Sequence, residues 1–140
     1  MSSKYEFKSG KTYFSSYIRY SGDKTKPGVF YVEQGATAVV SNEIFAVSKN
    51  VSIEKTGKGQ LTCVGTISKN AEIPGVRVEE GILRYITADQ KNLANLKRVT
   101  VKSGAVFHTS GGSQTLGTGN LVVDIEKGGL FKFSCGGYTY

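Results

Sequence analysis

The segment Val99-Thr100-Val101-Lys102-Ser103-Gly104 decides the fold, because its pattern of apolar, any, apolar, any, any, Gly recurs along the chain. Four other segments carry it: Tyr5-Glu6-Phe7-Lys8-Ser9-Gly10, Phe30-Tyr31-Val32-Glu33-Gln34-Gly35, Val76-Arg77-Val78-Glu79-Glu80-Gly81 and Val123-Asp124-Ile125-Glu126-Lys127-Gly128. A weaker copy, Val51-Ser52-Ile53-Glu54-Lys55-Thr56, has its glycine one place late, at Gly57. With Thr56 as the equivalent position, the intervals are 25, 21, 25, 23 and 24 residues. This near-constant interval predicts a repeat architecture.

A second apolar patch follows each copy, so each unit predicts two or three short strands separated by turns. The patches are Tyr13-Phe14, Val39-Val40, Leu61, Leu83 with Tyr85, Val106-Phe107, and Leu130-Phe131 with Phe133. Alternation sends the apolar residues of each strand to one face and the polar residues to the other. A single unit cannot bury its apolar face, whereas six stacked units can.

The repeat therefore predicts an all-β fold, a single-stranded right-handed parallel β-helix (solenoid) of about six coils. One domain spans residues 1–140, with residues 1–28 as an N-terminal cap and residues 129–140 as a C-terminal end strand. The repeat glycines suit sharp corners because glycine tolerates positive φ. Only Thr87 to Lys97 suggests a turn or short helix, from its capping-box spacing. The alternative is a β-sandwich or barrel of hairpins, in which strands usually return every 8–12 residues.

Composition limits the function classes. Lysine and arginine exceed aspartate and glutamate by 18 to 11, a net charge of +7, and four of the surplus charges lie in residues 1–28. One histidine and two cysteines exclude a zinc site of four cysteines, or of two cysteines and two histidines, and we expect no cofactor. No apolar stretch is long enough to span a bilayer, and residues 1–8 lack the apolar centre of a secretory signal.

The units resemble the coils of right-handed parallel β-helices, especially the passenger regions of bacterial autotransporter adhesins and the coils of phage and viral fibres. The best matches are Val99-Thr100-Val101-Lys102-Ser103-Gly104-Ala105-Val106 and Val123-Asp124-Ile125-Glu126-Lys127-Gly128-Gly129-Leu130. The resemblance lies in the repeat pattern. It implies a structural or adhesive role at a cell surface, outside the cell or in a virion, although no signal peptide is present.

An aromatic cluster near the N-terminus is the first candidate site. Tyr13, Phe14, Tyr17 and Tyr20 lie close in sequence to Lys11 and Arg19. Aromatic rings beside cations can stack sugars or bases of an anionic ligand. The same aromatics can instead cover the open end of the first coil, since solenoid ends must be protected or paired.

A possible cation column is the second candidate. Aligning the copies places Glu33, Glu54 and Glu79 one above another at about 4.8 Å, a repulsive stack unless it is compensated. A cation such as Ca²⁺ could compensate it. Lys55 and Arg77 lie close enough in sequence to do so instead, and we therefore expect no metal.

The remaining reactive residues show no sequence pattern typical of a catalytic site. A nucleophilic site at His108 would need Ser110 or Ser113 beside it and Asp124 behind it, and no nucleophile-elbow sequence surrounds them. Cys63 and Cys135 fall seven residues after their anchors, which predicts one column, three coils apart. That separation of about 14 Å is too long for a disulfide, so we expect two unpaired thiols.

The sequence thus predicts a non-enzymatic structural or adhesive β-solenoid that forms a homo-oligomer or fibre through its ends. The C-terminal tail carries no proline or acidic residue to discourage strand addition. One alternative is a module that binds a polyanion, either nucleic acid or an acidic glycan, through the net positive charge. A carbohydrate-active β-helix enzyme is the other.

Overall fold

The computed structural model describes residues 3–20, 25–46, 51–64, 74–87, 96–111 and 120–135. These residues form strands and no helix. The odd-numbered strands are β1 (Lys4–Phe7), β3 (Gly28–Val32), β5 (Ile53–Thr56), β7 (Gly75–Val78), β9 (Arg98–Val101) and β11 (Val122–Ile125). The even-numbered strands are β2 (Thr12–Tyr20), β4 (Thr37–Ala46), β6 (Gln60–Val64), β8 (Ile82–Thr87), β10 (Val106–Gly111) and β12 (Leu130–Cys135). The stretch predicted to hold a turn or short helix lies mostly outside the described residues.

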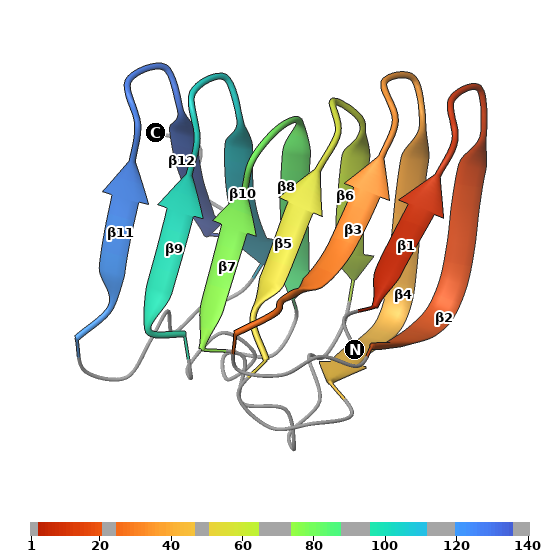
Figure 1. The fold of residues 1–140 in the computed structure, drawn as a ribbon, viewed down its shortest axis with the longest axis horizontal. Helices are drawn as coiled ribbons and strands as arrows, with labels where there is room; N and C mark the ends of the chain where they lie inside the picture. The colour runs from red at the N-terminus through yellow and green to blue at the C-terminus, as the bar shows by residue number, and fades with distance from the viewer. Residues whose placement is uncertain are drawn as a thin grey trace.

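The strands form two six-stranded sheets, one of odd and one of even strands, in the order β1-β3-β5-β7-β9-β11 and β12-β10-β8-β6-β4-β2. Consecutive strands lie in different sheets, so the chain crosses from one sheet to the other at each turn (Figure 1). We call one odd strand, its turn and the following even strand a rung. Every strand pair is parallel. The predicted all-β parallel solenoid is confirmed, and the hairpin sandwich or barrel, which requires antiparallel pairs, is wrong.

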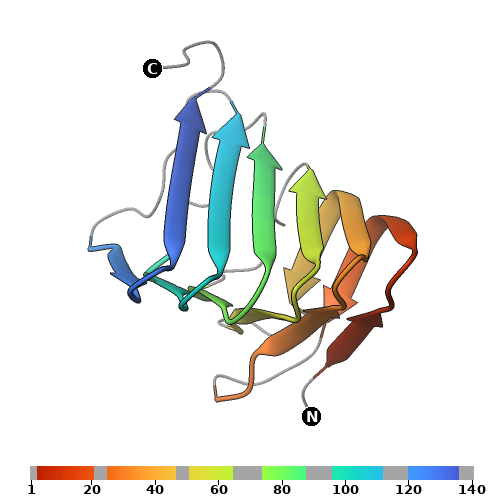
Figure 2. The same ribbon diagram turned by 90° about the horizontal axis from the view of Figure 1, so that it is seen from above.

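The rungs follow one another in chain order, so the first and last rungs lie at opposite ends of the stack (Figure 2). Equivalent aliphatic residues stack as predicted: Val76 pairs with Val99 and Val99 with Val123. Val78, Val101 and Ile125 form the neighbouring column in the same way. Alternation along each strand thus becomes a continuous apolar surface along each sheet.

The predicted turn glycines have the expected backbone conformation. Gly10, Gly35, Gly57, Gly81, Gly104 and Gly128 have φ between 67° and 87°. This is the left-handed region, which glycine adopts without the strain caused by a Cβ atom. The third turn uses Gly57, so the choice of Thr56 as the equivalent position is wrong and the intervals become 25, 22, 24, 23 and 24 residues.

The third rung also differs from the predicted register. Phe30 pairs with Lys55, four residues from the predicted partner Val51, and Ile53 pairs with Val76, two residues from the predicted partner Val78. Shifts of two or four residues keep every side chain on its face of the sheet, so Val51 and Ile53 both remain buried. The shift brings a lysine, Lys55, into a core column.

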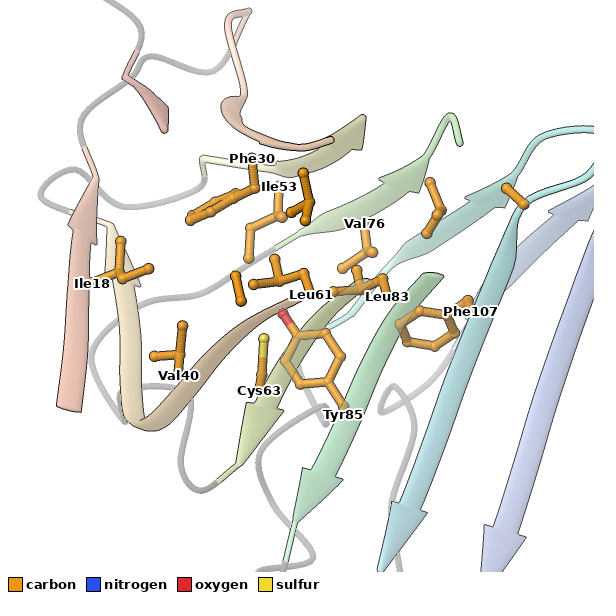
Figure 3. Packing of buried hydrophobic residues seen from close by; sticks show 14 of the residues in the cluster. Ile18, Phe30, Val40, Ile53, Leu61, Cys63, Val76, Leu83, Tyr85 and Phe107 are labelled. Carbon is orange, nitrogen blue, oxygen red and sulfur yellow. The ribbon is translucent and has the colours of Figure 1, made fainter. Parts of the chain in front are cut away.

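The core lies between the two sheets, where inward side chains of both sheets meet (Figure 3). Leu61, Leu83 and Phe107 form one column of the even-strand sheet. Cys63 and Tyr85 form the next column. Cys63 is a free, buried thiol, as predicted, and its burial raises its pKa to about 12.

Cys135 is not in the column of Cys63. The register places Phe133 opposite Thr109, in that column, and Cys135 opposite Gly111, two positions further along. The separation of three rungs agrees with the prediction, but the shared column is wrong because the turns differ in length. The side chain of Cys135 lies outside the described residues. Within the described ranges, the structure contains no helix able to cross a bilayer.

Candidate functional site

The C-terminal edge of the stack is an uncovered end of the core. Val123 and Ile125 on β11 are 40% and 48% exposed, whereas their column neighbours Val99 and Val101 are 1% and 0% exposed. Phe133 on β12 is 46% exposed beside the wholly buried Thr109. Val123, Ile125 and Phe133, which we call the C-terminal edge, are core residues by pattern over which the described residues place no further rung.

The last rung is nevertheless joined to the core. Phe131 on β12 is partly buried and packs on Phe107, with ring centroids 5.3 Å apart. Arg98 on β9 pairs with Asp124 on β11, and Lys102 pairs with Glu126 just beyond that strand. The C-terminal edge is therefore held in place while it stays exposed.

The N-terminal edge is formed by β1 and β2 and carries aromatic residues. The ring of Tyr5 stacks on Phe30, at 5.4 Å and 12°. Phe7 packs edge-on against Tyr13, at 5.1 Å and 70°. The rings of Tyr5, Phe7 and Tyr13 are half-buried against the core. Residues 4–20 of the segment predicted as a cap thus form the first rung, and its aromatics cover part of the core.

The predicted aromatic and basic residues differ in burial. Tyr20 is wholly buried, donates a hydrogen bond to the carbonyl oxygen of Val51 at 3.0 Å, and packs edge-on against Phe30. Burial raises the pKa of Tyr20. Tyr20 is thus a core residue through its inward position in β2, whereas the predicted ligand-binding role assumed an exposed ring.

The other members of the aromatic and basic cluster also differ in burial. Tyr13 is half-buried, and its hydroxyl accepts a hydrogen bond from the backbone N–H of Lys8 at 3.2 Å. Lys11, Phe14 and Arg19 are exposed. The side chain of Tyr17 lies outside the described residues.

The predicted glutamate column does not form. Glu54 lies between Val29 and Arg77 in the odd-strand sheet. Glu33 accepts a hydrogen bond from the backbone N–H of Ser9 at 2.7 Å, and Glu79 pairs with Arg77. The register shifts at β5, four residues against β3 and two against β7, separate the three carboxylates. Across the described ranges, no group of three or more potential metal ligands is present.

Lys55 does not compensate those carboxylates, although Arg77 does. The wholly buried Lys55 ammonium donates hydrogen bonds to the carbonyl oxygens of Gly57 at 2.6 Å, Thr56 at 2.9 Å and Glu80 at 3.1 Å. Burial lowers the pKa of Lys55 to about 8. Lys55 therefore satisfies the carbonyls of two successive turns from inside the solenoid.

His108 lies on the outer face of the even-strand sheet. Its Nε2 is 3.1 Å from the hydroxyl oxygen of Ser134 on β12. Asp124 lies in the other sheet and pairs with Arg98, so it does not support the imidazole. Ser110 lies two residues along β10 from His108, and Ser113 is outside the described residues.

Arg84, His108 and Lys132 form a column on this face that the sequence reasoning missed. They follow one another at intervals of 24 residues, each directly after an inward apolar residue of its unit. That recurrence could have revealed them. The repeat alignment followed the first strand of each unit, while these three residues lie on the second strand.

A shallow hollow of about 370 Å³ lies at the other sheet, lined by residues that include Ser52, Glu54, Arg77 and Arg98. Both of its arginines pair with a carboxylate, Arg77 with Glu79 and Arg98 with Asp124. The cations of this hollow are thus already neutralised.

Comparisons with protein-family models, with curated proteins and with solved structures found no match for this chain.

Proposed function

We propose that this protein is a non-enzymatic structural β-solenoid that associates end to end with copies of itself. The observation that carries the proposal is the exposure of Val123, Ile125 and Phe133, which are core residues by pattern, at the C-terminal edge. Exposed apolar residues that are buried one rung earlier mark a surface suited to a further rung.

The first rung of a second copy fits this surface in direction. All rungs run the same way, so β1 and β2 of one copy would lie parallel to β11 and β12 of the next. Both edges are the end strands of their sheets and present backbone N–H and C=O groups for pairing. The Tyr5 and Phe7 rings would then cover the aliphatic side chains of β11.

The two strands of the C-terminal edge, β11 and β12, carry neither proline nor an inward-pointing charge. Proteins protect edge strands with proline or with charged residues that point inward. Neither β11 nor β12 contains proline, and their charged residues, Asp124 and Lys132, occupy outward positions. An unprotected edge favours strand addition.

The resemblance of the repeat to autotransporter passenger and phage fibre coils supports the same role. We infer a surface, extracellular or virion component, a fibre or adhesin, whose outer faces contact a host surface or glycan. The bacterial passengers and viral fibres share with this chain the repeat pattern on which that inference rests.

End-to-end association is tested by sedimentation velocity over a wide range of protein concentration. We expect the wild-type mass to rise with concentration and the double variant Ile125→Lys/Phe133→Lys to remain monomeric, because two charges would be buried at the joint. The variant Gln60→Lys adds a charge to the outer face of the central strand β6 and should associate like the wild type. Circular dichroism confirms that each variant is folded.

Two results would contradict the proposal. One is a wild-type protein that stays monomeric at every concentration. The other is a double variant that associates as the wild type does, since the joint would then lie elsewhere.

A further inference from the structure

The outer face of the even-strand sheet carries a row of basic residues. Arg84 on β8 pairs in register with His108 on β10, and His108 pairs with Lys132 on β12. Neighbouring strands are about 4.8 Å apart, so the three side chains form one column on the outer face with that spacing. We call Arg84, His108 and Lys132 the basic ladder.

Among the described residues, no carboxylate forms an ion pair with the basic ladder. The strands β6, β8, β10 and β12 contain neither aspartate nor glutamate. The described ion pairs involve residues on or beside the odd-numbered strands: Lys4–Glu6, Lys8–Glu6, Arg77–Glu79, Arg98–Asp124 and Lys102–Glu126. One outer face is thus internally neutralised, and the other holds three basic groups with no described counter-charge.

Arg84 and His108 each show a consequence of their surroundings on this face. The Nε of Arg84 is shielded from solvent and has no hydrogen-bond partner among the described residues. A shielded donor without an acceptor is unfavourable, so an anion that reached it would be held strongly. The pKa of His108 is lowered by burial and by the charges of Arg84 and Lys132. Those two residues and the Ser134 hydroxyl are the described polar groups that face the imidazole from β8 and β12.

The shape and chemistry of this face favour one class of anion. The outward residues of β6, β8, β10 and β12 include no phenylalanine, tyrosine or tryptophan, so the row of large aromatic rings typical of single-stranded nucleic acid binding is missing. The hydroxyl groups of Ser110 and Ser134 lie beside the ladder, where they can bond to sugar hydroxyls. A pyranose ring is comparable in length to the distance between rungs.

We propose that the basic ladder binds a linear acidic polysaccharide that runs along the solenoid, with a carboxylate or sulfate group against each basic side chain. The ladder projects from the outer face of the sheet, whereas self-association uses the edge of the stack, and Lys132 is the ladder residue that lies beside that edge, next to Phe133 on β12. Its cations supply charge-assisted hydrogen bonds, and its hydroxyls contact the sugar rings.

The test compares two variants that lose the same charge. Binding of polygalacturonate oligomers and of heparin is measured by isothermal titration for the wild type, for Arg84→Gln/Lys132→Gln and for Arg98→Gln/Lys102→Gln on the other sheet. We expect the ladder variant to lose at least about tenfold in affinity, and its salt dependence to fall by about one unit of slope per cation removed. The control on the odd-strand sheet should bind nearly as the wild type does.

Acidity provides a second readout. Lowering the pH protonates His108, so the affinity of the wild type should rise as the pH falls, and His108→Gln should abolish that rise. Lys132→Gln alone, at an exposed position, keeps the test valid if the double variant does not fold.

Three outcomes would overturn the proposal. Equal losses in the ladder variant and the control would show that net charge alone attracts the polymer. Tighter binding of a single-stranded DNA oligomer, or of phosphatidylserine vesicles, would assign the face to another class of partner. No binding of either polysaccharide by the wild type would remove the site.

Discussion

Replacing Gly81 with alanine is expected to destabilise the protein by more than about 3 kcal/mol, a large part of the stability of a small domain. A Cβ atom there would lie 2.4 Å from the carbonyl oxygen of Gly59 and 2.5 Å from that of Gly57. Both oxygens belong to the backbone of the rung below, so the rungs must separate to make room. The φ of 67° adds strain of about 1–2 kcal/mol. Urea denaturation of both proteins measures the loss.

Gly104→Ala is the matched control for Gly81→Ala. Gly104 has a similar φ of 74°, but an added Cβ would meet no atom within 4 Å. We therefore expect only the conformational strain, about 1 kcal/mol. Equal losses at the two positions would show that the third and fourth turns are not in backbone contact.

Replacing Lys55 with methionine is expected to cost about 3 kcal/mol or more. Methionine nearly fills the same volume, yet it leaves the carbonyl oxygens of Thr56, Gly57 and Glu80 without their shared donor. Each buried polar group left without a partner costs about 1–3 kcal/mol. Lys58→Met, at an exposed position of the same turn, should change the stability by no more than about 0.5 kcal/mol. Chemical denaturation of the two variants would contradict the role of Lys55 if their losses were equal.

The lowered pKa of Lys55 also predicts the direction in which the free energy of unfolding changes with pH. The pKa of Lys55 is about 8 in the folded protein and 10.5 for an unperturbed lysine, so between these values the unfolded chain holds a proton that the folded protein has released. Raising the pH through this window therefore stabilises the folded state, by about 3 kcal/mol over the whole range. Tyr20 and Cys63, whose pKa values are raised, act in the opposite direction at high pH. The difference between wild type and Lys55→Met isolates the lysine, and a flat difference would contradict the shifted pKa.

The repeat was sufficient to predict the fold because stacked rungs and sharp turns each require particular residue types at regular intervals. Apolar pairs such as Val99 and Val101 must recur wherever a rung covers the next one. Glycine must recur wherever the corner requires positive φ, as at Gly81 and Gly104. Both requirements are local, so they are visible without coordinates.

The register of the third rung could not be predicted because a shift by an even number of residues changes no face. Either alignment buries Ile53, and only the paired backbones decide that Lys55 enters the core column. A lysine next to a glutamate is ordinarily a surface residue, so nothing local marked Lys55 as buried. The glutamate column and the placement of Cys135 failed for related reasons, since each assumed turns of uniform length.

The candidate sites depend on which residues are covered by a further rung, and a repeat pattern carries no information about that. Ile125 has the same pattern as Val101, and only its place in the last rung exposes it. Tyr20 looked like a ligand-binding aromatic, but the long strand β2 carries it into the core. The basic ladder was visible as a 24-residue interval once the second strands were aligned.

The parallel register is tested most directly by methyl–methyl nuclear Overhauser effects in protein with labelled valine, leucine and isoleucine methyl groups. We predict contacts between Val76 and Val99 and between Val78 and Val101, the pairs that adjacent rungs bring side by side. Spectra in which Val76 contacts Val101 and Val78 contacts Val99 would indicate antiparallel pairing and contradict the solenoid.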